Sequence, residues 1–369
     1  MTIANGEAIR VAVIPPTSAF NQNALFESRR LDSGAHSPNV HWLDCFAAVR
    51  DRGKGLNILF DTADMISLDD ADALVYMAQP ESPNHVLQNK RKYPELKSVL
   101  MMLETSLGCR YVANRENHTV YDAVITYIDT LVDDKRYFFL PPRAYFRDRV
   151  RNGLPFAERK MGCLVGTNRK MGYRTGLVTM RKGWKFSLRD WIDYISCPGE
   201  LISYRSEVGK MCAKYGERGF DLFGEGWELF RETREICKGV PRASALDYIG
   251  SYRYYFALEN HTGPHSFISE RIWDALWGDA VPVYRGNTRL SNFVPPECYI
   301  DAMRFRSTQD LFEYLCALSG HEWWQYRSAG RDFIHGERIA EFLPEAFADR
   351  FLGYIMTIVS SKLEPCLAR

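Results

Sequence analysis

The sequence predicts an α/β protein with two doubly wound domains that face each other across a cleft, followed by a helical C-terminal tail. Short apolar segments alternate with longer connections, which is typical of parallel sheets covered on both faces. This pattern occurs twice, and 369 residues are more than one core usually holds. We therefore place the first domain at 1–150, the second at 151–340 and the tail at 341–369.

The first half of the chain contains five segments that we interpret as buried strands. They are Arg10–Pro15, Leu56–Phe60, Ala73–Met77, Ser98–Leu103 and Asp122–Tyr127. Longer connections separate them, as parallel strands require. Residues 134–160 mix aromatic, proline and charged residues, and we interpret them as a linker or crossover.

The second domain repeats this organisation from Lys160 onward. Its predicted strands are Met161–Gly166, Gly219–Phe223, a segment that starts at Tyr252, Ala280–Tyr284 and Tyr299–Ile300. A helical pattern covers Leu201–Tyr215, and residues 307–369 are mostly helical in pattern. Because ligands of such sheets bind at the carboxyl ends of strands, we expect the functional residues there.

The composition is that of an ordinary soluble domain. The chain is 46% hydrophobic and 25% charged, and its formal net charge of +1 argues against bulk nucleic-acid binding. The N-terminus lacks the pattern of a secretory signal, and no apolar run is long enough to span a membrane. Nine dispersed cysteines without a C-x-x-C pair are typical of reduced thiols. We expect a cytoplasmic protein, either free or at the inner face of the membrane.

The most informative stretch is Tyr252–Gly286. It is predicted as an apolar strand, a polar turn at 259–264, an amphipathic helix and a second apolar strand. The helix opens with Glu270 and Arg271. Free N–H groups at a helix start and an arginine suit a phosphate, and a glutamate can accept hydrogen bonds from sugar hydroxyls. The pattern indicates a nucleotide or nucleotide-sugar site. The alternative is a glutamate favoured by the helix dipole and an arginine on a solvated face.

Four other positions are candidates for binding or catalysis. Arg205 lies in a predicted helix, where an exposed helix charge is the alternative interpretation. Asn168 follows the strand MGCLVG and could equally be a turn residue or helix cap. Gly224 ends a strand and permits either close approach to a ligand or a simple tight turn. Glu104 ends the strand SVLMML and is a candidate general base, with an ordinary loop glutamate as the alternative.

Three patterns are weaker candidates. Asp70 and Asp72 form a D-x-D pattern that in some glycosyltransferases holds a divalent cation, but here it looks like a solvated strand entry. His261 and His265 lack a third ligand nearby, which disfavours a zinc site. The run Trp323–Tyr326 could be a sugar-stacking platform, although helical spacing favours packing.

These residues carry a family resemblance. The chain resembles glycosyltransferase family 10, the α-1,3/1,4-fucosyltransferases, in the segments FALEN, FISER and VPVYRG and in the following FVPPECYIDAMRF. It looks most similar to the bacterial members of that family. Upstream, FDLFGEGW, ELISYR and CLVGTN resemble the family's nucleotide-binding segments, and LETS resembles the strand end with its proposed base. The resemblance is specific over 160–305 and weaker over 1–135.

The resemblance implies a GT-B fold, with two Rossmann-like domains: a C-terminal domain that binds GDP-fucose and an N-terminal domain that faces the acceptor. It implies an inverting transfer that needs no divalent cation and no tightly bound cofactor. Carried over, Glu270 holds the ribose, and Arg205 and Arg271 neutralise the diphosphate. Asn260 lines the donor pocket, and Glu104 takes the proton from the acceptor hydroxyl.

Three residues depart from the family pattern. Phe267 stands where the family has tyrosine, Arg271 replaces lysine and Ser269 replaces threonine. Phe267 thus occupies a donor-site position of the family but lacks the hydroxyl group of tyrosine. Asn168 and Gly224 are also expected at the donor site, because they lie in motifs that resemble the family's. The departures make GDP a firmer expectation than fucose.

The main hypothesis is an inverting transferase that moves fucose, or a related sugar, from a GDP-sugar to an oligosaccharide or lipid-linked glycan. A lipid-linked acceptor would imply peripheral membrane association. The alternative is a non-catalytic glycan- or nucleotide-binding protein that keeps the fold. A nicotinamide oxidoreductase is disfavoured, because no G-x-G-x-x-G follows the first strand.

Overall fold

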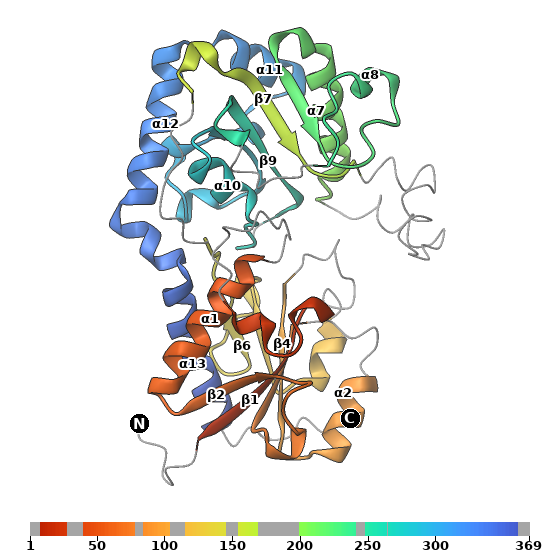
Figure 1. The fold of residues 1–369 in the computed structure, drawn as a ribbon, viewed down its shortest axis with the longest axis vertical. Coiled ribbons are helices and arrows are strands. Elements are labelled where there is room, and N and C mark those ends of the chain that lie inside the picture. The colour runs from red at the N-terminus through yellow and green to blue at the C-terminus, as the bar shows by residue number, and fades with distance from the viewer. Residues whose placement is uncertain are drawn as a thin grey trace.

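The computed structural model describes residues 8–27, 40–77, 84–103, 115–144, 154–168, 199–240, 248–263 and 265–360. It contains two sheets whose strands all run parallel, a six-stranded sheet in the N-terminal half and a five-stranded sheet in the C-terminal half. The two domains lie one above the other in Figure 1. The α/β class with two doubly wound domains is thus confirmed.

The N-terminal sheet has the strand order β2-β1-β3-β4-β5-β6. Its strands are β1 (Ile9–Ile14), β2 (Ile58–Thr62), β3 (Ala73–Tyr76), β4 (Lys97–Met101), β5 (Ala123–Thr126) and β6 (Tyr137–Phe139). Helix α1 (Val40–Gly55) covers one face and α2 (Asn84–Lys92) the other, because the apolar side chains of these strands alternate between two core clusters.

The interpretation of residues 134–160 as a linker is wrong in part. Tyr137–Phe139 form β6, which pairs with β5 as the sheet edge. The strand has three residues and is followed by Pro141 and Pro142, so it is too short to show a periodic pattern. Its Phe138 packs on Tyr354, a residue distant in sequence, at 4.9 Å between ring centres.

The C-terminal sheet has the strand order β11-β10-β9-β7-β8. Its strands are β7 (Lys160–Val165), β8 (Phe220–Phe223), β9 (Tyr252–Gly263), β10 (Val281–Asn287) and β11 (Ile300–Asp301). Its helices are α7 (Ile202–Lys214), α8 (Arg231–Arg234), α10 (Arg271–Trp277), α11 (Thr308–Ala317) and α12 (Gly320–His335). Clusters that include α10 on one face and α7 with α11 on the other bury the two sides of the sheet.

The polar turn predicted at 259–264 is also wrong in its extent. Strand β9 continues to Gly263, and the short segment 199–201 pairs alongside it. Leu201 donates its backbone N–H to the Asn260 carbonyl (2.9 Å), and Thr262 donates to the Gly199 carbonyl (2.7 Å). Backbone pairing with this distant segment keeps polar residues in extended conformation, which local composition does not reveal.

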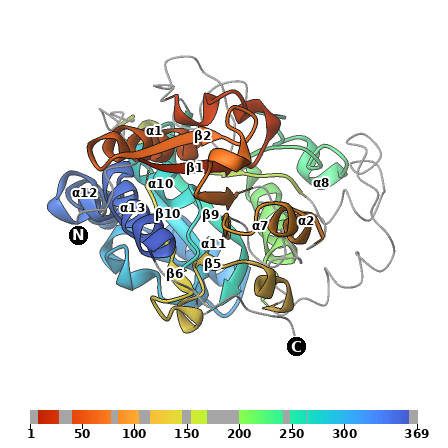
Figure 2. The ribbon, with the colours of Figure 1, turned by 90° about the horizontal axis from the view of Figure 1, so that it is seen from below.

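The C-terminal tail returns to the first domain. Helix α13 (Pro344–Ser360) lies beside α1 (Figures 1 and 2), and its apolar face joins the N-terminal core cluster. Phe351 contacts Phe46 edge to face at 5.5 Å between ring centres, and Phe347 contacts Trp42 at 5.9 Å. Helix α13 therefore ties the two domains together through the N-terminal core.

None of the helices in the described ranges combines the length and apolar character that crossing a bilayer requires.

Candidate functional site

Side chains from three separate segments meet at the carboxyl end of β9. This strand and its neighbour β7 are the central pair at which the strand order of the sheet reverses, the place where open α/β sheets form a ligand crevice. The segments are the loop after β7, the first turns of α7 and the start of α10. Asn168, Arg205, Glu270 and Arg271 belong to them, and Asn260 belongs to β9 itself.

Arg205 is not an exposed helix charge. It is 3% exposed, and its Nη2 donates to the carbonyls of Leu258 (2.9 Å) and Glu259 (3.3 Å) and to Oδ1 of Asn260 (2.7 Å). The strand end lies beside α7, so its carbonyls and the Asn260 amide oxygen receive the guanidinium. A buried cation is thus fixed where the sheet opens, with Asn260 as one of its partners.

Asn168 and Gly224 build the wall beside Arg205. The Asn168 amide oxygen accepts from the hydroxyl of Ser206 (2.7 Å), the residue after Arg205. Gly224 has φ +123°, and a Cβ there would lie 2.5 Å from the carbonyl oxygen of Gly166. Close backbone approach therefore requires glycine at 224, which agrees with the tight turn expected from the sequence.

A buried carboxylate organises the other side of the strand. Glu259 is 1% exposed; its Oε1 accepts from the backbone N–H of Ser269 (2.9 Å), and its Oε2 lies 3.5 Å from Nη1 of Arg271. Arg271 also donates to the Ser269 hydroxyl (3.0 Å). Glu270, at the N-cap of α10, is partly exposed beside Arg271, with 4.0 Å between Oε1 and Nη1.

Glu259 was not among the residues selected from the sequence as site candidates. Burial, the largest influence, raises its pKa, while Arg271 and the N–H of Ser269 act in the opposite direction. The available signal was a carboxylate inside the apolar run YYFALEN. Through its backbone carbonyl Glu259 contacts Arg205, and through its side chain it contacts Arg271, so it connects the two predicted phosphate-binding arginines.

The glycine of VPVYRG is explained by the same carboxylate. A Cβ at Gly286 would lie 2.3 Å from Cγ of Glu259 and 2.7 Å from the hydroxyl of Tyr284. The neighbouring strand must therefore leave this volume empty for the glutamate side chain. The motifs FALEN and VPVYRG thus pack together as one unit, although twenty residues separate them.

Phe267 lies at the boundary with the N-terminal domain. Its ring contacts Tyr127 of the N-terminal domain at 5.2 Å between centres, and the N–H of Ser266 donates to the Tyr127 carbonyl (3.0 Å). A cavity of about 10 Å³ lies here, lined by Met102, Leu103, Tyr127, residues 140–143 and residues 266–268. Leu103 directly precedes Glu104, which lies outside the described residues.

Two histidines bridge the end of β9 to the same boundary. The rings of His261 and His265 stack, with 3.2 Å between Nδ1 and Nε2, and His265 Nδ1 accepts from the N–H of Phe267 (3.2 Å). His265 also contacts Tyr127 edge to face. Burial, aided by His261, lowers the pKa of His265 to about 4, so the imidazole is neutral at pH 7.

The other weaker sequence candidates, the D-x-D pattern and the tryptophan run, lie elsewhere. Asp72 accepts from the backbone N–H of Arg10 (2.7 Å), so it caps a strand. Within the described ranges, no group of three or more His, Cys, Asp or Glu side chains is arranged to hold a metal ion. Trp323 and Trp324 lie on α12, near the amino ends of the strands of the C-terminal sheet.

Comparison with known proteins agrees with this geometry. The model of the family described as Glycosyltransferase family 10 (fucosyltransferase) C-term matches residues 220–328. The 3-galactosyl-N-acetylglucosaminide 4-alpha-L-fucosyltransferase FUT3 of Bos taurus is 38% identical over 82 residues, and its counterpart in Homo sapiens is 36% identical over 81 residues. Each match covers 21% of this chain and 22% of the relative, so the chain aligns with about a fifth of the length of these relatives.

Solved structures resemble nearly the whole chain. An alpha1,3-fucosyltransferase with GDP has a TM-score of 0.54 at 11% identity, with 98% of this chain and 94% of that chain covered. A glycosyltransferase from Rickettsia africae has a TM-score of 0.52 at 10% identity, with 96% and 100% covered. The fold is the GT-B arrangement of glycosyltransferases. The resemblance to glycosyltransferase family 10 that the sequence motifs indicate is confirmed over residues 220–328, which include Gly224, Asn260, Glu270 and Arg271 of the site described above.

The contact between Gly286 and Glu259 predicts a steric effect. We expect Gly286→Ala to lower the free energy of unfolding by ~1–3 kcal/mol, because the added methyl group overlaps a buried side chain. Urea unfolding measures the change. Gly353→Ala is the matched control, since no atom lies within 4 Å of a Cβ there and an alanine inside α13 should stabilise slightly. Equal effects of the two substitutions on the free energy of unfolding would contradict the close packing of Gly286 against Glu259.

The low pKa of His265 predicts acid sensitivity. The unfolded chain takes up a proton near pH 6.5 and the folded protein only near pH 4, so this contribution to stability is present above pH 6.5 and is lost as the pH falls towards 4. The charged groups that influence it are His261, Asp129 and Arg289. Thermal unfolding between pH 4 and 7 should show a shallower pH dependence for His265→Asn than for the wild type. The exposed His321→Asn should retain the wild-type slope.

Proposed function

We propose that the protein is an inverting glycosyltransferase that moves fucose, or a related sugar, from a GDP-sugar to a hydroxyl group of a glycan. The observation that carries the proposal is the convergence of Arg205, Asn260, Glu259 and Arg271 at the carboxyl end of β9 in a GT-B fold, where the last three lie within the segment that matches the family 10 model. The similar solved structures include an alpha1,3-fucosyltransferase with GDP and one with GDP-fucose.

The donor side supplies charge where a leaving group needs it. Displacement at the anomeric carbon places developing negative charge on the β-phosphate of GDP. Preorganised cations stabilise that charge most effectively when they are already fixed, because they need no reorganisation during the reaction. Arg205, held by carbonyl groups, and Arg271, held by Ser269 and Glu259, meet this requirement, and we assign the diphosphate to them. We assign the ribose hydroxyls to the partly exposed Glu270.

The acceptor side needs one general base. We assign this role to Glu104, which follows Leu103 at the cavity between the domains. A glutamate carboxylate can accept the proton of the attacking hydroxyl, and inversion follows because a single displacement occurs. The donor side carries two fixed cations, so we propose that transfer proceeds without a divalent cation.

A binding protein that has kept the fold is the competing function. Under that alternative, GDP and a glycan would bind, but no GDP would be released from GDP-fucose in the presence of acceptors. Retention of Arg205, Glu259 and Arg271 in one hydrogen-bonded arrangement favours the enzyme, since these groups suit a leaving group better than a neutral sugar. We propose a cytoplasmic site of action, with peripheral membrane association when the acceptor is lipid-linked.

The assignment of the diphosphate predicts the effect of charge removal. We expect Arg205→Ala and Arg271→Ala each to weaken GDP binding about 10- to 100-fold, because each removes a charge-assisted hydrogen bond. Isothermal titration with GDP, UDP and CMP measures this. Arg304→Ala removes a largely exposed arginine and should leave the affinity unchanged. Arg205→Lys keeps the charge and separates loss of binding from loss of fold. Preference for UDP over GDP would overturn the donor assignment.

The assignment of the base predicts a separation of binding from chemistry. We expect Glu104→Gln to reduce transfer by about 10²- to 10⁴-fold while GDP affinity stays at the wild-type value, since the amide cannot accept the proton. Release of GDP from GDP-fucose in the presence of candidate acceptors measures transfer. Glu116→Gln, an exposed position in the same domain, is the control. Full activity of Glu104→Gln would remove this residue from the role of base.

A further inference from the structure

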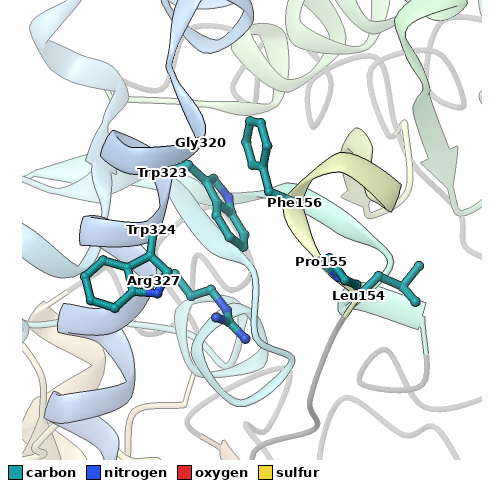
Figure 3. A pocket seen from close by; sticks show the side chains of 7 residues that line it. All are labelled: Leu154, Pro155, Phe156, Gly320, Trp323, Trp324 and Arg327. Carbon is teal, nitrogen blue, oxygen red and sulfur yellow. The ribbon is translucent and has the colours of Figure 1, made fainter.

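A second pocket lies at the opposite end of the C-terminal domain from the carboxyl-end site. It has a volume of about 410 Å³ and is lined by Leu154, Pro155, Phe156, Gly320, Trp323, Trp324 and Arg327 (Figure 3). These residues precede β7 and form the first two turns of α12, so β7, of six residues, separates the pocket from the carboxyl-end site by roughly 20 Å. The volume falls in the ~300–1,000 Å³ range of small-molecule sites.

The aromatic walls of this pocket are held rigidly. Trp323 is 3% exposed, and its Nε1 donates to the Arg253 carbonyl (2.9 Å). The Phe156 ring lies 5.4 Å from the Trp323 ring and is covered on one side by the Arg253 guanidinium at 3.7 Å. A ligand would therefore meet preformed aromatic surfaces, and its binding would not carry the entropy cost of ordering these side chains.

Trp324 is different, because it is 52% exposed. Its ring flanks the Arg327 guanidinium on the side opposite Leu154 and Pro155 (Figure 3). An indole that covers neither the core nor another described ring leaves a large, stiff apolar face available for stacking.

Arg327 provides oriented donors in the middle of the pocket. Its Nε and Nη2 donate to the two carboxylate oxygens of Asp279 at 2.9 and 2.8 Å, which fixes the plane of the guanidinium. Arg159 and Arg331 bond to the same carboxylate. The carboxylate of Asp279 thus pairs with three guanidinium groups. The cluster formed by Asp279 and these arginines therefore carries a net positive charge.

We infer that this pocket is a second carbohydrate site, which takes a sugar ring carrying a carboxylate from a glycan chain. The apolar face of the ring would stack on Trp324, its hydroxyls would accept from Nη1 of Arg327, and its carboxylate would complement the excess positive charge. The inference rests on the proposed function, because a glycan acceptor that passes around the domain, a path longer than the roughly 20 Å through buried β7, would reach both sites at once and bind more tightly than through either alone.

The test uses the full chain saturated with GDP, so that the donor site is occupied. The probes are oligosaccharides that end in glucuronic, galacturonic or N-acetylneuraminic acid, each beside its neutral analogue, and saturation-transfer NMR reads binding at the ring protons. We expect the acidic probes to bind more tightly than the neutral ones. Trp324→Ala should weaken that binding about tenfold, as truncation of an anchoring tryptophan does, and Trp324→Phe should restore most of it.

The outcomes separate the two proposals. If Trp324→Ala binds every acidic probe as the wild type does, the second site is wrong even when GDP binding and transfer are intact. If transfer fails but the acidic probes bind in a Trp324-dependent manner, the proposed function is wrong and the second site stands. Sedimentation of both variants is the remaining control, because a self-association that Trp324→Ala abolishes would assign this surface to a second copy of the chain and overturn the inference.

Discussion

The arrangement of the carboxyl-end site depends on one buried carboxylate, that of Glu259. A charge with 1% exposure is tolerated only when hydrogen bonds and an opposite charge compensate for lost hydration. The Ser269 N–H and Arg271 supply that compensation, which fixes where α10 must begin. Gly286 keeps the neighbouring strand clear of the side chain. The position of Arg271, the path of residues 266–270 and the glycine of VPVYRG all follow from this group.

The second constraint is the connection between the domains. Helix α13 lies within the N-terminal core cluster, although it follows the whole C-terminal domain in sequence. Near the site, Tyr127 contacts both His265 and Phe267, and Asp129 pairs with Arg289. The segment that carries the donor-side arginine is thus anchored on the acceptor-side domain. Any change in the angle between the domains would have to break these contacts or move Arg271 with them.

The sequence predicts the strands well because buried parallel strands are short and continuously apolar, as in the segments at Ala73 and Val281. The prediction fails where the conformation of a segment depends on partners that are distant in sequence. Strand β6 is stabilised by Tyr354, and β9 is extended by residues 199–201. Of the site, Arg205 and Arg271 can be found by motif, but the burial of Glu259 and its contact with Gly286 exist only after two strands pair. The pocket beside Trp324 joins segments more than 160 residues apart, so no local pattern predicts it.

Two of the buried carboxylates of the C-terminal domain, those of Asp279 and Glu259, have pKa values shifted in opposite directions. Burial opposes the ionisation of Asp279, but hydrogen bonds from Arg327, Arg331 and Arg159 outweigh it and lower the pKa of Asp279. Glu259 has a single guanidinium at 3.5 Å, and burial keeps its pKa raised. Asp279 therefore anchors three arginines, whereas Glu259 holds Arg271 together with the hydroxyl group of Ser269. On the proposed assignment, a diphosphate would meet Arg205 and Arg271 already held at the end of β9, so the positive charge is in place before the leaving group forms.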